Sequence, residues 1–342
     1  YADSPASDWI LMGGITHESV EFRVLLESNG LLRISLDSDL QDVVRTVNIT
    51  VSNDSTIPQA IHVEGLNATT QYYYSIRDDL GGSFRTSGVN GQPFNFTIAL
   101  GGCAKTGSRH RIFDEILKEN LLFFLHLGDF HYENIGTNNM AARLDAIGTV
   151  LNSESQAKLF RNVPLVYMWD DHDWLGNDAH GYDEDKPGAR DTALESYRLA
   201  FPHYELFHND TESPFHAFTI GTVRFIVSDV RSESTDTSVF SDIQREWLRV
   251  ELEAADSYDF VVWVTTKPWI GSPETHNDAW RGQPGERALV SEWISNVSSQ
   301  NVLAVSADAH MVAFDDGSHT YYGENGDDST RYSFPILQSG PL

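Results

Sequence analysis

The sequence predicts a two-part protein, with a small all-β sandwich over residues 1–92 and a layered α/β domain over residues 93–342. Two patterns support this division. As far as residue 87, short segments rich in β-branched and aromatic residues recur at roughly 8–12-residue spacing between Gly, Asn, Asp and Ser, as in β-sandwiches. From residue 94, strand-like and helix-like segments alternate, which is typical of a layered α/β fold. A linker of small and polar residues at 87–93 separates the two parts.

The first part contains six expected strands, because each segment alternates or is rich in β-forming residues. They are EFRVLLE (21–27), LLRISLD (31–37), VVRTVNITV (43–51), AIHVEG (60–65), QYYYSIRD (71–78) and GSFRT (82–86). The stretch GLNATTQYYYSI (65–76) resembles a segment of fibronectin type III domains, in which a tyrosine clamps the turn before a late strand. That tyrosine is structural, and we expect no chemistry from it.

The second part alternates apolar strand-like runs with segments whose apolar residues recur three and four positions apart, as on one face of a helix. The expected strands are 94–100, 121–127, 163–169, 216–221, 223–229, 260–266 and 302–308. The expected helices are 110–120, 139–161, 189–201, 241–255 and 284–299. The Ser-x-x-Gln start of the segment 241–255 fits a capping box, which marks the beginning of a helix.

Composition narrows the class of protein. Of 342 residues, 50 are acidic and 23 basic, which gives a net charge of −27. This charge disfavours nucleic-acid binding, which needs a basic surface, and adsorption to anionic membranes. The longest apolar run, 121–125, is far shorter than the ~18–20 residues that span a bilayer. We therefore expect no nucleic-acid-binding surface and no membrane span.

Two features bear on where the protein works. The single cysteine excludes a disulfide within the chain and by itself suggests a reducing compartment. Against this, the chain begins at Tyr1, as a processed protein would, and carries six N-x-[ST] glycosylation sequons. The sequons are at Asn48, Asn53, Asn67, Asn95, Asn209 and Asn296. On balance we expect a secreted protein stabilised by its core.

The strongest polar clusters come directly after four of the expected strands. They are GGC (101–103), GDFHY (128–132), DDHD (170–173) and ADAH (307–310). Ligands of open α/β sheets bind at this carboxyl edge. Several aspartates gathered there would repel one another, because carboxylates ~4 Å apart repel by about 1 kcal/mol even in water. Bound cations relieve this repulsion, so the sequence predicts a metal cluster.

These motifs resemble the calcineurin-like metallophosphoesterases, and within them the PhoD-like alkaline phosphatases. The resemblance covers about 95–342 and rests on the order of GGC, GDFHYE (128–133), WDDHD-x-x-x-ND (169–178), SDVRSE (228–233) and SADAH (306–310). The D-x-H opening of the superfamily is absent, with Cys103 near its place. A second departure is TTKPW (265–269), where the superfamily has a His before a Pro.

The resemblance implies a dinuclear or larger metal centre. Its expected ligands are Cys103, Asp129, Tyr132, Asp171, Asn177, Asp308 and His310. Asp129 would bridge two metals. Thiolate and phenolate donors suit Fe(III), and oxygen donors at a second site suit Ca(II), with Zn or Mn as alternatives. Read alone, Cys103 could equally be an inert core cysteine.

The resemblance also implies the residues that act on substrate. His172 would donate a proton to the leaving oxygen, and Arg231 would grip phosphate through two parallel N–H bonds. Lys267 is a second candidate for holding phosphate. A structural role for His172 and a salt-bridge role for Arg231 remain open at this point.

The function that follows is a secreted phosphoesterase that hydrolyses small phosphate monoesters by attack of a metal-activated hydroxide. One alternative is a phosphodiesterase acting on nucleic acid, a teichoic-acid-like polymer or a phospholipid headgroup. The other is a non-catalytic cell-surface binding protein that holds metal structurally. The sequence does not predict the oligomeric state.

Overall fold

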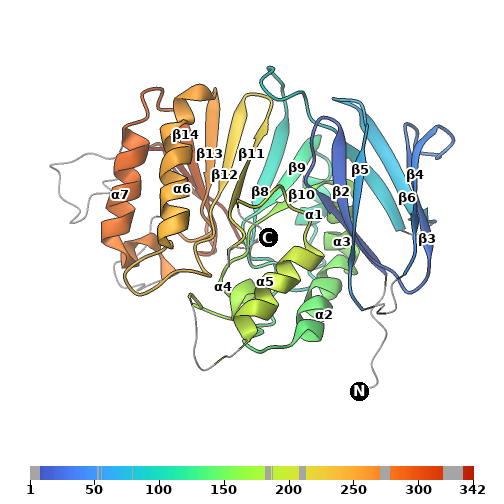
Figure 1. Ribbon diagram of the computed structural model, residues 1–342, viewed down its shortest axis with the longest axis horizontal. Helices are drawn as coiled ribbons and strands as arrows, with labels where there is room; N and C mark the ends of the chain where they lie inside the picture. Colours follow the sequence, from blue (N-terminus) through green and yellow to red (C-terminus); the bar gives the residue numbers. More distant parts are fainter. Residues whose placement is uncertain are drawn as a thin grey trace.

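The computed structural model describes residues 8–51, 54, 56–78, 80–181, 186, 188–207, 213–269, 278–318 and 334–342, whose strands form three sheets (Figure 1). The first sheet has the order β5-β2-β1-β10-β9-β8. Its strands are β1 (Trp9–Gly13), β2 (Ser19–Leu25), β5 (Gln59–Glu64), β8 (Thr97–Gly101), β9 (Leu121–His126) and β10 (Leu165–Tyr167). The part 121–127 of the sequence is a buried strand, as predicted.

The second sheet is antiparallel, with the order β4-β3-β6-β7, and faces the β5-β2-β1 part of the first sheet across an apolar core. Its strands are β3 (Gly30–Ser35), β4 (Val43–Ile49), β6 (Gln71–Arg77) and β7 (Leu80–Arg85). Phe22 and Tyr74 pack edge to face with ring centroids 5.0 Å apart. The Asn67 amide donates a 2.8 Å hydrogen bond to the Tyr72 hydroxyl, which is the expected tyrosine clamp.

The predicted sandwich shares a sheet with the rest of the chain. Strand β1, which was not among the expected strands, pairs in parallel with β10 through Gly13 and Leu165. A Cβ at Gly13 would lie 2.2 Å from the Leu165 carbonyl oxygen, so this close approach needs glycine. The first sheet therefore crosses the predicted boundary at 92/93, and the division into two domains stays a prediction.

The third sheet has the order β11-β12-β13-β14-β16-β15 and stacks on the β8-β9-β10 part of the first sheet. Its strands are β11 (His216–Ile220), β12 (Val223–Val227), β13 (Phe260–Val264), β14 (Val302–Ser306), β15 (Ala313–Asp315) and β16 (Ile336–Gln338). Phe123 joins the two sheets, with its ring centroid 6.0 Å from that of Phe218 and 5.3 Å from that of Phe225.

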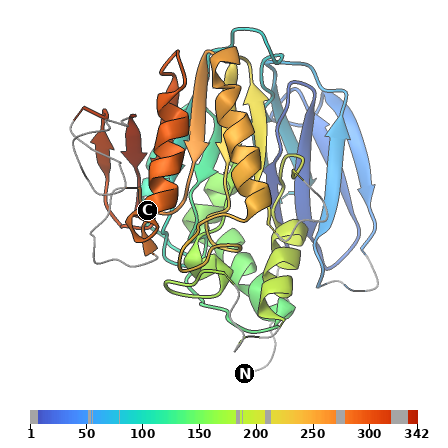
Figure 2. The same cartoon turned by 60° about the vertical axis from the view of Figure 1, so that its left-hand side comes forward.

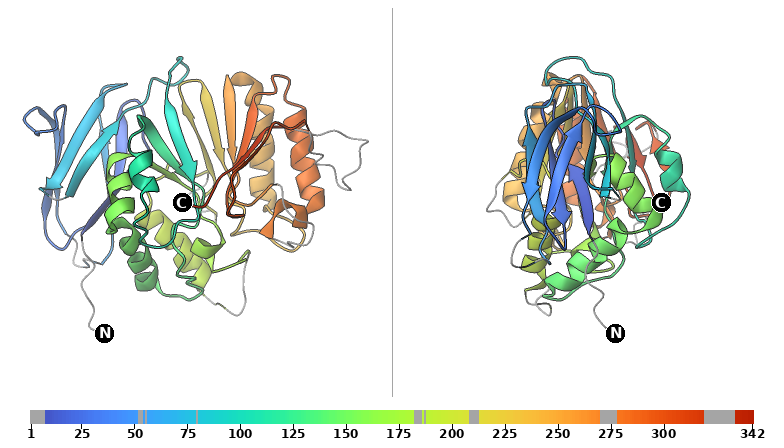
Figure 3. Two further views of the ribbon diagram at one scale, coloured as in Figure 1. Left: turned by 180° about the vertical axis from the view of Figure 1, so that it is seen from behind. Right: turned by 90° about the vertical axis from the view of Figure 1, so that its right-hand side faces the viewer.

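Helices cover the outer faces of this pair of sheets (Figures 2 and 3). Apolar side chains of α1 (Ile112–Ile116), α2 (Met140–Leu151) and α3 (Glu154–Asn162) pack in the core of the first sheet. Those of α6 (Asp242–Glu253) and α7 (Pro284–Ser295) pack against the third sheet. The remaining helices are α4 (Asp171–Trp174) and α5 (Ala189–Ala200). None of the helices that the structure describes has the length and hydropathy of a membrane span.

Two local expectations differ from the structure. The segment 139–161 forms two helices, because the Asn152 amide bonds back to the Gly148 carbonyl and α3 starts afresh after Ser153. At the start of α6, Ser241 caps the helix by accepting from the Gln244 amide at 3.3 Å. The Gln244 side chain does not complete the capping box; it bonds the backbone of Asp229 at 2.8 and 2.9 Å instead.

Candidate metal centre

The predicted polar clusters meet where two groups of parallel strands end. In the first sheet, β8, β9 and β10 lead into Cys103, Asp129 and the pair Asp170 and Asp171. In the third sheet, β12, β13 and β14 lead into the residues Arg231, Lys267, Asp308 and His310. The two stacked sheets thus bring their carboxyl edges together at one site, as expected for a ligand-binding edge.

Four of the expected ligands have left-handed backbone conformations. The φ angles are 57° at Cys103, 54° at Asp129, 63° at Asp308 and 50° at His310. Residues with a Cβ rarely adopt positive φ, and such strain gathers at functional sites. The backbone bends sharply after each strand, which brings Cys103, Asp129 and His310 into one group of candidate ligands and Asp308 into another, with Asp170 and Asp171.

Glycines let the loops that carry these ligands touch. Gly128 has φ 91°, and a Cβ there would lie 2.3 Å from the Cβ of Asp170. A Cβ at Gly102 would lie 2.7 Å from the Gly128 carbonyl oxygen. The glycines of the GGC and GD motifs are therefore required for the close packing of three strand ends.

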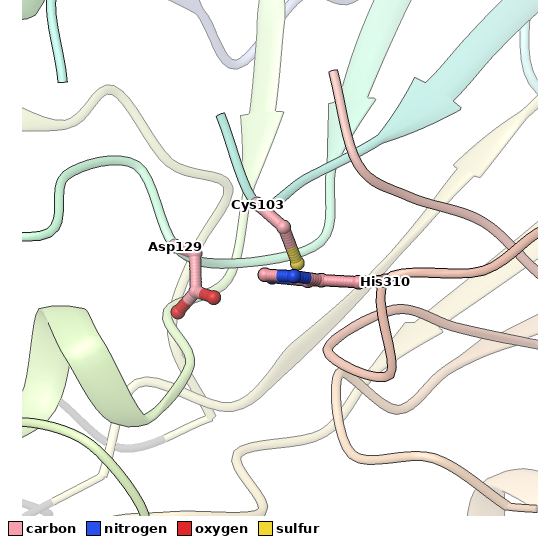
Figure 4. Close-up of side chains that lie close together, drawn as sticks. All are labelled: Cys103, Asp129 and His310. Atoms are coloured by element: carbon pink, nitrogen blue, oxygen red, sulfur yellow. The ribbon is translucent and has the colours of Figure 1, made fainter. Parts of the chain in front are cut away.

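The first ligand group consists of Cys103, Asp129 and His310, whose ligand atoms all lie within 4.8 Å of one another (Figure 4). Tyr132 joins this group. Its hydroxyl donates a 2.8 Å hydrogen bond to Oδ2 of Asp129 and lies 2.9 Å from Nε2 of His310. The resemblance assigned these four residues to the metal centre, and the structure brings them together from three separate strand ends.

The second ligand group consists of Asp129, Asp171 and His172, again within 4.8 Å. Asp129 belongs to both groups, which is the arrangement of a bridging carboxylate. The half-buried His172 places Nδ1 2.5 Å from Oδ1 of Asn134, and since an amide oxygen only accepts, this bond requires the tautomer with a proton on Nδ1. Its ring centroid lies 4.2 Å from that of Tyr132.

Several buried polar atoms at this site fit a metal ion. Oδ1 of Asp129 and Oδ1 of Asp171 are buried without a hydrogen-bond partner. Burial raises the pKa of Asp129 well above its usual value, with nearby aspartates adding to the shift, and it raises the pKa of Asp308 to about 9. Burial also raises the pKa of Cys103 and of Tyr132. A bound cation would stabilise the ionised forms of these groups and so lower their pKa values. Sulfur, imidazole and phenol donors suit a transition metal.

Arg231 lies fully buried among carboxylates. Its Nε donates to Asp170 and its Nη1 to Asp278, the latter at 2.9 Å. Its Nη2 lies 3.6 Å from Asp308 and 4.0 Å from Asp171, and has no hydrogen-bond partner. Two sides of the guanidinium thus donate hydrogen bonds to carboxylates, and the third side, at Nη2, is only within ion-pair distance of Asp308 and Asp171. A two-bond grip on phosphate stays a prediction.

Lys267 and Asn177, two other predicted site residues, lie in contrasting environments. Lys267 is fully buried, with Nζ 3.3 Å from Oε1 of Gln283, and burial lowers its pKa to about 7. Asn177 has an exposed side chain, and its role as a ligand stays a prediction. Its neighbour Asp178 belongs to a further group of carboxylates, with Asp171 and Asp278, within 4.8 Å.

Several residues that build the site, two of them (Asp173 and Asp178) within the quoted motifs, had no role predicted from the sequence. They are Asn134, Arg143, Asp173, Asp178 and Asp278. Asp173 had a local signal, because an Asp three residues after Asp170 at a helix start fits a capping box, and the structure shows both bonds of that box. For Asp278 no local signal existed, since tertiary structure alone brings it to Arg231 and to the carboxylates of Asp171 and Asp178.

Comparisons with known proteins agree with this picture. No family model matches the chain. Alkaline phosphatase D of Bacillus subtilis (strain 168) is 22% identical over 313 residues, which cover 74% of this chain and 54% of that protein. This chain therefore spans about half the length of its curated relative.

Two solved structures share the fold. The structure of PhoD aligns with a TM-score of 0.81 at 16% identity, over 99% of this chain and 77% of that one. Purple acid phosphatase PPD1 from yellow lupin (Lupinus luteus) seeds aligns with a TM-score of 0.62 at 11% identity, over 97% and 64%. The resemblance inferred from the motifs is confirmed, and the structural likeness extends to the part ahead of residue 95.

Proposed function

We propose that this chain, which has the fold of a PhoD-like metallophosphoesterase, hydrolyses phosphate monoesters at the metal centre around Asp129. One observation carries the proposal: a single buried carboxylate is shared by two ligand groups, and His172 stands beside both. Metals held this way would acidify water and neutralise charge on the phosphate oxygens. The sequence similarity to alkaline phosphatase D supports the same reaction class.

The chain's own residues supply proton transfer and charge. Because Nδ1 of His172 bonds Asn134, Nε2 is the nitrogen left for substrate, and it would donate a proton to the leaving oxygen when the ring carries a proton on both nitrogens. Nη2 of Arg231 offers N–H donors without a partner in the fold, and it would hold a phosphate oxygen. Buried Lys267, whose pKa Arg231 and Asp278 also affect, would add positive charge behind that phosphate only below its lowered pKa of about 7.

Hydrolysis of p-nitrophenyl phosphate tests the proposed reaction. Asp129→Asn should lower kcat/KM at least about 100-fold, because both ligand groups lose a charged member. Asp145→Asn, an exposed position on α2, is the matched control and should leave kcat/KM unchanged. Equal activities in the two variants would contradict the proposal.

The bis(p-nitrophenyl) ester, assayed beside the monoester, distinguishes monoesterase from diesterase activity. We expect higher kcat/KM on the monoester, and the reverse order would establish the diesterase alternative. A metal-loaded protein that cleaves neither ester would favour a non-catalytic binding protein.

For the metals, we propose Fe(III) at Cys103, Asp129, Tyr132 and His310, and Ca(II) at the neighbouring carboxylates. The mixed sulfur, phenol and imidazole set supports iron, and the oxygen-rich groups support calcium. Elemental analysis with a visible spectrum tests this assignment. Tyr132→Phe should abolish a phenolate-to-iron band, and a colourless wild-type protein containing no iron would exclude Fe(III).

We also propose that the protein is secreted and N-glycosylated. The sequon residues Asn48, Asn67, Asn95 and Asn296 are exposed, whereas Asn53 and Asn209 lie outside the described residues. Enzymatic removal of N-glycans should lower the mass of the native protein. An unchanged mass would contradict glycosylation.

A further inference from the structure

A basic segment follows the first metal ligand directly. Residues 105–111 read KTGSRHR, with three cations and no acid, in a chain with 50 acidic and 23 basic residues. The side chains of Lys105, Arg109 and Arg111 are exposed, and none forms a salt bridge with a described residue. Nearby Lys118, by contrast, is paired with Glu115 at 2.6 Å.

The structure holds this segment against the metal centre. The Tyr132 amide donates a 2.8 Å hydrogen bond to Oγ1 of Thr106, and the Cys103 amide donates a 3.1 Å bond to the Gly128 carbonyl. A turn closes when the Ser108 amide bonds the Lys105 carbonyl at 2.9 Å. Since two residues span at most about 7 Å, the Cα of Lys105 lies within that distance of the Cα of Cys103.

The position and charge of the segment suggest a specific role. Cys103, Asp129 and Nη2 of Arg231 are buried, whereas His310 is exposed, so the site where the scissile phosphate would bind opens to solvent on the His310 side. The cations of 105–111 are outside, in contact with solvent, so they are placed for a different anionic group. Lys105 is close enough to Cys103 for its charge to act at the site, because screening acts over about 8 Å at physiological salt.

We propose that segment 105–111 binds a second anionic group on the alcohol side of the substrate. The preferred substrate class is then a small phosphate ester that also carries a carboxylate or another phosphate. This inference rests on the proposed function and adds a substrate preference to it. It also accounts for a local excess of positive charge in a strongly acidic chain.

Three substrates with the same three-carbon skeleton test the inference. Glycerol 3-phosphate carries one anionic group, 3-phosphoglycerate adds a carboxylate, and 2,3-bisphosphoglycerate adds a phosphate as well. We expect the wild type to show higher kcat/KM on the second and third than on the first. Comparing kcat/KM for 3-phosphoglycerate with that for 2,3-bisphosphoglycerate shows whether a carboxylate is enough for the preference or a second phosphate is needed.

Substitutions in segment 105–111 test whether its cations cause this substrate preference. Lys105→Ala and Arg109→Ala should each lower the ratio of kcat/KM for 3-phosphoglycerate to that for glycerol 3-phosphate about threefold, and the double variant about tenfold. Arg33→Ala removes an equally exposed cation from β3, in the second sheet, and should leave the ratio unchanged. Circular dichroism and thermal unfolding of each variant verify the fold.

The outcomes separate the two proposals. Hydrolysis of all three esters with equal kcat/KM, or an unchanged ratio in the double variant, would overturn the segment's role while leaving phosphatase activity intact. If the wild type hydrolyses none of them, p-nitrophenyl phosphate decides the proposed function, which fails if that ester is not cleaved either. Calorimetric titration of 3-phosphoglycerate then decides the inference, because binding weakened about tenfold in the double variant supports it and equal binding overturns it.

Discussion

The carboxylate of Asp173 accepts a 2.9 Å hydrogen bond from the backbone amide of Phe130, and so joins two loops that carry metal ligands. The same Oδ1 accepts from the His131 amide at 3.2 Å, and Oδ2 accepts from the Asp170 amide at 3.2 Å. Behind it, buried Arg143 donates to the carbonyl of Asp173 at 3.0 Å. Asp173 thus fixes the distance between Asp129 and Asp171 without being a ligand of either group.

Asp173→Ala should therefore destabilise the protein and loosen the metal centre. Three buried amides lose their acceptor, and one unsatisfied buried donor costs about 1–3 kcal/mol, so we expect a loss of at least about 3 kcal/mol of unfolding free energy. Urea unfolding measures this loss, and elemental analysis should show less metal per chain. Asp145→Asn, exposed on α2, is the control for both measurements. Full metal content in Asp173→Ala would show that the loops hold their geometry without this carboxylate.

Gly128→Ala should be strongly destabilising. The added Cβ meets the Cβ of Asp170 at 2.3 Å, and φ of 91° is unfavourable for alanine. Gly285→Ala is the matched control, because a Cβ at that position in α7 meets nothing within 4 Å. We expect a drop of more than about 2 kcal/mol in the unfolding free energy for the first and little change or a small gain for the second. Similar stabilities of the two variants would show that the strand ends do not need this approach.

Without metal, the protein should lose stability as pH rises. Burial raises the pKa of Asp308 from 3.8 to about 9, so the folded state retains a proton that the unfolded state has released. The contribution to stability is complete below pH 3.8 and disappears as pH rises through about 9. In EDTA, wild-type unfolding free energy should fall from pH 6 to pH 8 more steeply than that of Asp308→Asn, by up to about 1.4 kcal/mol per pH unit. Equal slopes would show that Asp308 is not desolvated, and saturating metal should remove the difference.

His126 should make the protein sensitive to acid. It is buried beside Phe130, with ring centroids 5.2 Å apart, and burial lowers its pKa from 6.5 to about 3. The unfolded state then binds more protons between these values, so the stability present above pH 6.5 is lost as pH falls toward 3. In His126→Phe, the slope of unfolding free energy below pH 6.5 should be smaller by up to about 1.4 kcal/mol per pH unit. Above pH 7 the two proteins should differ by a constant amount, and parallel curves in acid would contradict the prediction.

The local sequence was sufficient for most elements of the fold. Strand 121–127 and the carboxyl edge of the parallel strands were predictable because periodicity and apolar runs are local properties. The placement of β1 was not predictable in this way. Its apolar run marks a buried strand, but its partner β10 is about 150 residues away along the chain, and only packing brings Gly13 to Leu165.

At the metal centre, too, local sequence predicted some features and only packing decided others. The sequence by itself determined which residue types follow each strand, and hence that Cys103, Asp129 and His310 each stand beyond the carboxyl end of a strand. Tertiary structure alone decided that Cys103, Asp129 and His310 meet across two sheets and that Arg231 has two sides paired with Asp170 and Asp278. The physical reason is that ion pairs and ligand groups depend on atoms meeting within a few ångströms. Sheet stacking sets such distances between residues that lie far apart in the chain.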